Sequence, residues 1–152
     1  MKKIYFINII ILLYFSNSFT QTFKYNGINY SVTDSVNKYA EVSNNRNDIW
    51  GYLEILDFVT YNNIVYSVTT IRESAFNGNN AVKSIKIIGN NITSISKNSF
   101  KDTRNLESIN IPNSVISIED SAFENCYDLE SINIPNSVIS IGDSAFKNCT
   151  SL

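Results

Sequence analysis

The thirteen residues LESINIPNSVISI run from Leu106 to Ile118 and occur again, unchanged, from Leu129 to Ile141. The likeness continues beyond them, because the 23 residues of Leu106–Asp128 and those of Leu129–Ser151 differ at only four positions. These differences are Glu119/Gly142, Glu124/Lys147, Tyr127/Thr150 and Asp128/Ser151. A fixed period of this length is typical of repeat proteins, in which each copy forms one coil of a solenoid.

Two less regular copies precede this pair. VKSIKIIGNNITSISKNSFKDTRN, from Val82 to Asn105, is one residue longer in its turn, and VTTIRESAFNGNNA, from Val68 to Ala81, is a partial copy. A phenylalanine holds the same place in all four copies. Because successive coils give equivalent residues nearly the same environment, we expect these side chains to form one buried column. The column comprises Phe76, Phe100, Phe123 and Phe146.

Each copy predicts the same local structure. The stretch LxSIxI alternates apolar and polar residues, which favours a short strand with one buried face. Pro112 and Pro135, each followed by Asn and Ser, end this strand because proline cannot donate to a ladder. A second short apolar pair follows, and the spacing of SAFxNC predicts a single helical or 3₁₀ turn that closes the coil. One such unit buries its apolar edge only when it is stacked on another.

The pattern resembles the BspA-like leucine-rich repeats, whose unit reads approximately LxxIxIPxSVxxIGxxAFxxCxx. The resemblance covers about residues 53–152. It implies a repeat solenoid, a β-rich α/β leucine-rich-repeat right-handed superhelix, with binding or adhesion roles at the cell surface or outside the cell. The copy from Val82 departs from the pattern, because Ile88 and Gly89 replace the proline turn and Thr103 stands where Cys is usual.

Residues 21–52 lie outside the repeats and are interpreted as an N-terminal β cap. Asn26-Gly27 between two aromatic and β-branched runs predicts a hairpin, which a strand, a polar loop and a return strand would follow. We expect four aromatic side chains to pack in this cap: Tyr25, Tyr30, Tyr39 and Trp50. The repeats then begin with a strand that carries Leu53 and Ile55, and a second hairpin is expected around Asn62-Asn63.

Residues 1–20 have the pattern of a cleaved signal peptide. MKK supplies positive charge, IYFINIIILLYF an apolar core and SNSFTQ small polar residues, with cleavage expected after Thr20 or Ser18. About twelve apolar residues are too few to cross a bilayer, which needs roughly twenty. The sequence therefore predicts a secreted or cell-surface protein without a transmembrane span in its mature chain.

The composition argues against catalysis and against nucleic-acid binding. The chain has no histidine, and 12 Lys and Arg residues stand against 14 Asp and Glu residues. Glu107 with Glu130 and Asp120 with Asp143 are carboxylate pairs of the kind that hydrolyse glycosides. Each pair, however, is one position repeated in successive coils, so repetition alone explains it. We therefore expect a protein that is not an enzyme and uses no metal or cofactor.

Two cysteines occupy one column of the repeat. Cys126 and Cys149 would lie one coil apart, about 5 Å, which is within reach of a disulfide. Neighbours on parallel strands seldom have the Cβ geometry that a disulfide needs, so we expect free, buried thiols.

The outward positions of the first strand in each copy form the candidate binding face. Regular rows of this kind would be presented rigidly to a protein or glycan ligand. The residues of this face are Lys83, Ser84, Lys86, Glu107, Ser108, Asn110, Glu130, Ser131 and Asn133. The alternative hypothesis is a structural or assembly element, or a truncated piece of a longer array. Its uncapped C-terminal edge would then dock onto a partner or self-associate.

Overall fold

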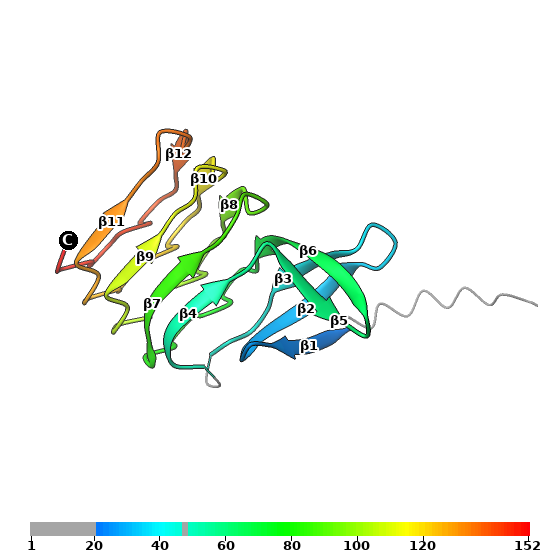
Figure 1. Ribbon diagram of the computed structural model, residues 1–152. Coiled ribbons are helices and arrows are strands. Elements are labelled where there is room, and N and C mark those ends of the chain that lie inside the picture. Colours follow the sequence, from blue (N-terminus) through cyan, green and yellow to red (C-terminus); the bar gives the residue numbers. More distant parts are fainter. Residues whose placement is uncertain (1–20, 47–48) are drawn as a thin grey trace, which may run out of the picture.

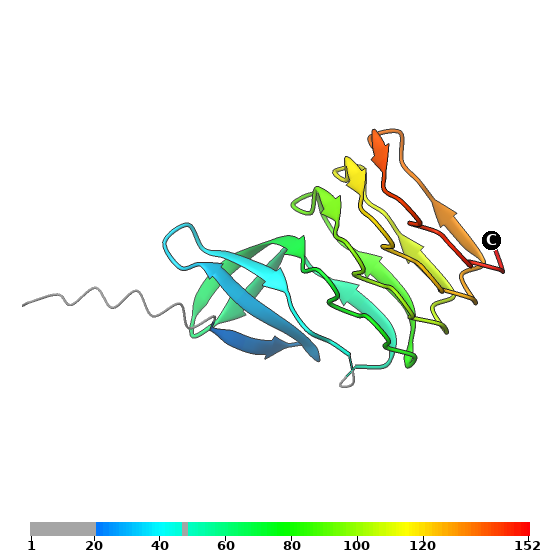
Figure 2. The same ribbon diagram turned by 180° about the vertical axis from the view of Figure 1, so that it is seen from behind.

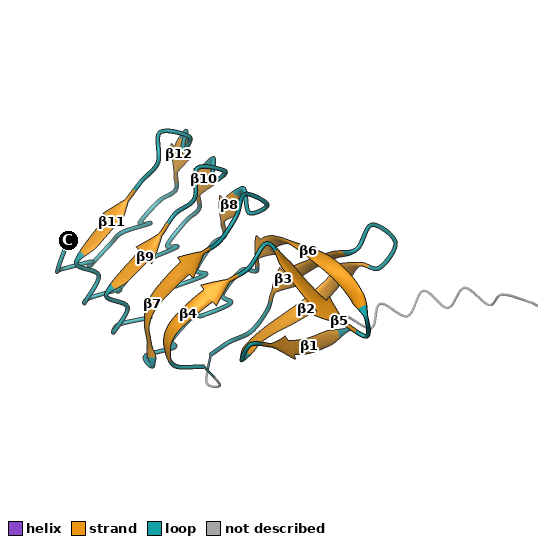
Figure 3. Ribbon diagram, in the orientation of Figure 1, coloured by secondary structure: helices purple, strands orange, loops and turns teal. Residues whose placement is uncertain are grey.

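The computed structural model describes residues 21–46 and 49–152, so the predicted signal peptide lies outside the described residues. These residues form strands joined by turns and loops, and none of them is in a helix (Figure 3). The strands are β1 (Thr22–Tyr25), β2 (Ile28–Asp34), β3 (Tyr39–Val42), β4 (Gly51–Ile55), β5 (Phe58–Tyr61), β6 (Ile64–Ile71), β7 (Val82–Ile87), β8 (Ser94–Ile95), β9 (Ser108–Asn110), β10 (Ser117–Ile118), β11 (Ser131–Asn133) and β12 (Ser140–Ile141).

The strands make two sheets that run along the solenoid as separate rows (Figures 1 and 2). The four-stranded sheet has the order β11-β9-β7-β4, and the eight-stranded sheet has the order β1-β2-β3-β6-β8-β10-β12, with β5 beside β6. Within the repeats the pairing is parallel and joins equivalent residues, as where Ile109 lies between Ile85 and Ile132. From Val82 onward each coil therefore gives one strand to each sheet, as the repeated sequence predicts, whereas the first coil gives both β5 and β6 to the eight-stranded sheet.

The phenylalanine column is confirmed. Successive ring centroids of Phe76, Phe100, Phe123 and Phe146 are 5.2, 5.2 and 5.3 Å apart, with interplanar angles of 15°, 8° and 5°. The first three rings are fully buried. We number the four coils by these residues, so that the first coil contains Phe76 and the fourth Phe146. The column fills the space between the two sheets and the closing turns.

The closing turn of each coil is not helical, and this prediction was wrong. In the third coil the N–H groups of Ser121, Phe123 and Asn125 donate to carbonyl oxygens of the fourth coil, at 2.9, 2.7 and 2.8 Å. Ser121 and Asn125 also have positive φ, 52° and 62°. Because alternate N–H groups bond between coils, a continuous ladder within the segment cannot form. Only separate turns remain, such as Cys126 N–H to Phe123 O at 3.2 Å.

The N-terminal strands extend the eight-stranded sheet. Asn26 and Gly27, with φ of 47° and 86°, join β1 and β2 in the predicted hairpin. Strand β3 then pairs in parallel with β6, so the first coil continues directly from the N-terminal strands. The expected return strand does not pair with β3. That segment is β4, which pairs with β7 in the other sheet, because Leu53 and Ile55 face the core of the first coil.

The conformations of two further turns account for the residues found in them. Asn62 and Asn63, both at positive φ, join β5 to β6 and confirm the second hairpin. In the second coil the missing proline turn is organised by Asp57, whose carboxylate accepts the N–H groups of Asn90 and Asn91 at 2.9 and 3.1 Å. Gly89 has φ of 92°, and a Cβ there would lie 1.7 Å from the Asp57 carboxylate. Only glycine therefore fits at this place.

The four aromatic residues assigned to the N-terminal packing divide into two groups. Tyr30 is fully buried and Tyr25 packs partly against the core, as expected. Tyr39 is exposed, and Trp50 is 79% exposed, so the packing prediction was wrong for both. Trp50 lies just before β4, next to Gly51 at φ 79°, where the β4–β7 register shifts and the regular strand pattern has not begun.

Candidate functional site

The nine residues of the candidate binding face lie on, or directly before, β7, β9 and β11 of the four-stranded sheet. The register aligns Ser84 with Ser108 and Ser131, and it aligns Lys86 with Asn110 and Asn133. Equivalent residues therefore form rows that cross the sheet from coil to coil. We call these nine residues the polar rows.

Contacts between neighbouring coils fix several side chains of the polar rows. Lys83 Nζ lies 2.6 Å from Glu107 Oε1, and the hydroxyls of Ser84 and Ser108 are 2.9 Å apart. The hydrogen bond and the negative charge of Glu107 raise the pKa of Lys83. These side chains are half-exposed yet held in one arrangement, so a ligand would meet a surface that is already ordered.

Equivalent asparagines in these rows have different roles. The Asn110 amide accepts the N–H of Ile87 at 2.7 Å and donates to the Ile87 carbonyl at 3.1 Å, so it satisfies the backbone of the second coil. Both side chains are exposed, but among the described residues the Asn133 amide, at the same place in the fourth coil, makes no such bridge to the backbone of its neighbour. The sequence gives both residues the same role, whereas the structure makes Asn110 a bridge between coils.

Two residues that sequence analysis missed adjoin the polar rows. Tyr52 and Glu54 of β4 are aligned with Ser84 and Lys86, and the Lys86 ammonium lies 3.6 Å from the Glu54 carboxylate. A hollow of about 540 Å³ lies at this end of the sheet, and part of its lining comes from the β1–β2 turn. It is lined by Asn26, Tyr52, Leu53, Glu54, Ser84 and Lys86. The alternation around Leu53 and Ile55 was the signal that could have placed both residues outward.

One carboxylate of each pair, Glu107 and Asp120, has a structural partner. Glu107 binds Lys83, and the Asp120 carboxylate accepts the N–H of Asp143 at 3.0 Å while lying 3.8 Å from the Lys97 ammonium. Each contact joins one coil to the next, in keeping with a role for these carboxylates in the stacking. Within residues 21–46 and 49–152, no group of three or more His, Cys, Asp or Glu side chains could hold a metal ion.

Both cysteines are free thiols, as predicted. Cys126 is buried and Cys149 half-buried, and desolvation raises the pKa of each thiol. Each Sγ–H donates to the carbonyl oxygen of the phenylalanine in the preceding coil, at 3.1 Å in both cases. Thr103 does the same through its hydroxyl, at 3.0 Å. The column therefore selects a small side chain that can donate a hydrogen bond, which explains how threonine replaces cysteine in the second coil.

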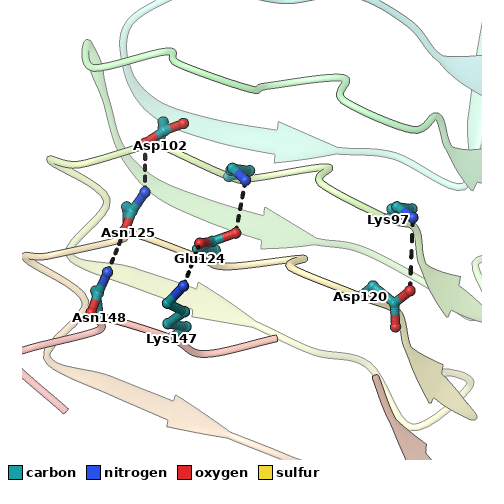
Figure 4. A network of polar contacts seen from close by, with 8 residues as sticks. Lys97, Asp102, Asp120, Glu124, Asn125, Lys147 and Asn148 are labelled. Atoms are coloured by element: carbon teal, nitrogen blue, oxygen red, sulfur yellow. Dashed lines mark hydrogen bonds and ion pairs between the residues drawn. The ribbon is translucent and has the colours of Figure 1, made fainter. Parts of the chain in front are cut away.

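A second set of polar contacts runs along the closing turns (Figure 4). The Glu124 carboxylate lies 2.8 Å from the Lys101 ammonium and 3.5 Å from that of Lys147, so charges alternate from coil to coil. Hydrogen bonds from Lys101 and Ser121 lower the pKa of Glu124 to about 2. The change from Glu124 to Lys147 between two nearly identical copies thus creates an attraction where a repeated glutamate would create repulsion.

Asparagines beside this charge row form a parallel ladder (Figure 4). The Asn125 amide donates to the Asp102 carboxylate at 2.8 Å, and the Asn148 amide donates to the Asn125 side-chain oxygen at 2.8 Å. All three residues have positive φ, which asparagine and aspartate adopt more readily than most residues. These side-chain contacts along the closing turns join each coil to the next and so stabilise the stacking.

The parallel coils, the two rows of strands and the phenylalanine column define a repeat solenoid. The family described as the BspA type leucine-rich repeat region matches residues 56–152 in six copies, and the chain belongs to this family. The resemblance drawn from the repeated sequence is thereby confirmed.

Solved structures of bacterial proteins share the fold. A leucine-rich repeat protein from Bacteroides ovatus is 35% identical with a TM-score of 0.75, and the match covers 83% of this chain and 33% of that one. The chain thus spans about a third of the length of that relative. A leucine-rich repeat protein from Bacteroides capillosus is 23% identical with a TM-score of 0.68, covering 81% of this chain and 93% of that one. The T. pallidum leucine-rich repeat protein is 17% identical with a TM-score of 0.64, covering 87% and 69%.

The latter two likenesses concern the fold alone. No curated protein matches the chain. In the part of the chain that the structure describes, no helix has the length and apolar character needed to cross a membrane.

Proposed function

We propose that this is an exported, non-catalytic repeat protein that binds a protein or glycan at the cell surface or outside the cell. The ligand contacts the outer face of the four-stranded sheet through the polar rows. The observation that carries the proposal is the set of contacts between coils, above all the Lys83–Glu107 pair and the Ser84–Ser108 hydrogen bond. Because these contacts order the side chains in advance, binding costs less conformational entropy.

The proposal includes a division of the chain. Residues 1–20 direct export, residues 21–52 act as a β cap on the first coil, and residues 53–152 form the binding array. The parallel pairing of β3 with β6 supports the cap, because β3 then occupies the edge that β6 would otherwise leave open. We take the coils to wind in a right-handed superhelix, the hand that nearly all crossovers between parallel strands have.

A pull-down from extracellular-matrix and cell-surface extracts tests this function. The face variant carries Lys83→Ala, Lys86→Ala and Asn133→Ala, and it keeps Asn110 because that amide satisfies the Ile87 backbone. The control variant carries Lys97→Ala and Asp120→Ala, two half-exposed residues outside the polar rows. Wild type and control should capture the same component and the face variant should not. Equal capture by all three folded proteins would contradict the proposed face.

A second candidate function is assembly through the fourth coil. Ile139, Ile141 and Leu152 are exposed there, and β11 and β12 each pair on one side only. Such an edge accepts either a further coil of a longer chain or a second molecule. Light scattering after size-exclusion chromatography over a hundredfold concentration range tests self-association. A mass that stays that of one chain at every concentration rules it out.

A further inference from the structure

The hollow on the four-stranded sheet lies where the β1–β2 turn meets the first two coils. Its lining comes from the turn residue Asn26, from β4 and from β7. A volume of about 540 Å³ is within the range of small-molecule sites, roughly 300–1,000 Å³. The hollow is therefore large enough to hold part of an oligosaccharide.

An exposed aromatic ring forms part of this lining. Tyr52 is 79% exposed, and so is Trp50, whose Cα is two residues away and hence within about 7 Å. The β4–β7 register shifts between Gly51 and Tyr52, and Gly51 has φ of 79°. Bulges of this kind redirect side chains and are frequent beside functional sites. An exposed aromatic side chain in the lining of a hollow, as Tyr52 is, is typical of surfaces that bind a ligand.

The two lysines near Tyr52 are each paired with a carboxylate. Lys86 is 3.6 Å from Glu54, and Lys83 is 2.6 Å from Glu107. An ionic ligand would have to displace one of these partners, whereas a neutral ligand leaves both ion pairs intact. The same side chains provide both acceptors and donors, and the Ser84 hydroxyl and the Asn26 amide provide both kinds themselves. Hydroxyl groups, which donate and accept, match such a lining.

We propose that this hollow binds a neutral glycan, with the C–H face of a sugar ring stacked on Tyr52. The sugar hydroxyls bond Glu54, Ser84 and Lys86, and Asn26 closes the site from the N-terminal strands. The proposal rests on the proposed function, which it narrows to one class of ligand and to one end of the face.

Isothermal titration calorimetry of the purified protein tests this assignment. The probes are neutral tetrasaccharides of glucose, mannose, galactose and N-acetylglucosamine, and a sulfated tetrasaccharide serves as the anionic comparison. At least one neutral probe should bind, and Tyr52→Ala should weaken it by about tenfold or more. Phe58→Ala is the matched control, because Phe58 is also a strand aromatic that is largely exposed but lies outside the hollow. The control should bind as wild type does.

Three results would overturn the assignment: no neutral probe binds, the sulfated probe binds more tightly, or Tyr52→Ala and Phe58→Ala bind equally well. These failures are distinguishable from failure of the proposed function. If the pull-down still captures a partner that depends on the polar rows while no neutral probe binds, the glycan assignment is wrong and the binding role stands. If neither assay depends on this face, both proposals fall.

Discussion

The third and fourth coils have nearly the same sequence and very different surroundings. Ile118 and Ile141 occupy the same place in the repeat, yet Ile118 is 1% exposed and Ile141 is 51% exposed. Phe123 is fully buried between two rings, whereas Phe146 contacts one ring and is half-buried. The repeated sequence determines whether each side chain faces inward or outward in its coil. Burial depends on whether a neighbouring coil covers it, and that information lies outside the repeat.

The largest difference in stability between equivalent substitutions in these two coils should come from the phenylalanine column. Phe123→Ala removes a fully buried ring and should cost about 3–5 kcal/mol of unfolding free energy. Phe146→Ala should cost about 1–2 kcal/mol, because its ring is only half-buried. Urea melts followed by circular dichroism measure both values. Equal losses would mean that the two coils have the same environment in solution, for example through association of the fourth coil.

Replacing the equivalent asparagines Asn110 and Asn133 of the polar rows should give a smaller difference in unfolding free energy. Asn110→Ala leaves the N–H of Ile87 without its hydrogen bond and should cost about 1–2 kcal/mol. Asn133→Ala removes an exposed side chain and should stay within about 0.5 kcal/mol. The same melts apply, with ligand capture as a second reading. A larger loss at Asn133 than at Asn110 would contradict the bridging role assigned to Asn110.

The row of alternating charges formed by Lys101, Glu124 and Lys147 predicts a loss of stability at acidic pH. The pKa of Glu124 falls from 4.5 to about 2 on folding, so its carboxylate stabilises the folded protein fully at pH values above about 4.5. This contribution is lost as the pH falls from about 4.5 to about 2. Glu124→Gln should therefore lower the urea midpoint at pH 7 and match wild type near pH 2. A constant difference between the two proteins across this range would contradict the ionic pairing with Lys101.

The smallest change in unfolding free energy is expected for a substitution in the cysteine column. Cys126→Thr keeps a small side chain that donates to the Phe100 carbonyl, as Thr103 does in the second coil. The unfolding free energy should change by less than about 1.5 kcal/mol. Thermal melts under reducing conditions measure it, with Cys126→Ala as the comparison that removes the donor. A loss greater than that of Cys126→Ala would show that hydrogen bonding does not select the residue here.

Much of the architecture could be predicted because stacked coils make a local pattern into a global one. The period alone aligned Phe76, Phe100, Phe123 and Phe146, and the Asn-Gly and Asn-Asn pairs located both hairpins. The closing turn was mispredicted as helical, because residue spacing does not reveal that alternate N–H groups bond to the next coil. Asp57 as the partner of the Gly89 turn lies 32 residues away in sequence, and no local pattern connects the two.

The candidate site could be predicted only in part. Strand alternation gave the polar rows, since outward and inward positions follow from a period of two. Trp50 was expected to pack in the N-terminal β cap, but it is exposed beside a glycine at positive φ and a register shift. The hollow beside Tyr52 depends on Asn26, which the fold of the N-terminal strands brings to the first two coils.

By itself the sequence determined the period, the faces of the strands and the membership of the chain in a repeat family. These are properties of residue order, which a solenoid converts directly into position because every coil contacts the next in the same way. Only the tertiary structure decided which equivalent residues are buried, which asparagine bridges two coils and where aromatic rings remain exposed. Those properties depend on groups distant in the chain, whose distances and hydrogen bonds exist only once the coils are stacked.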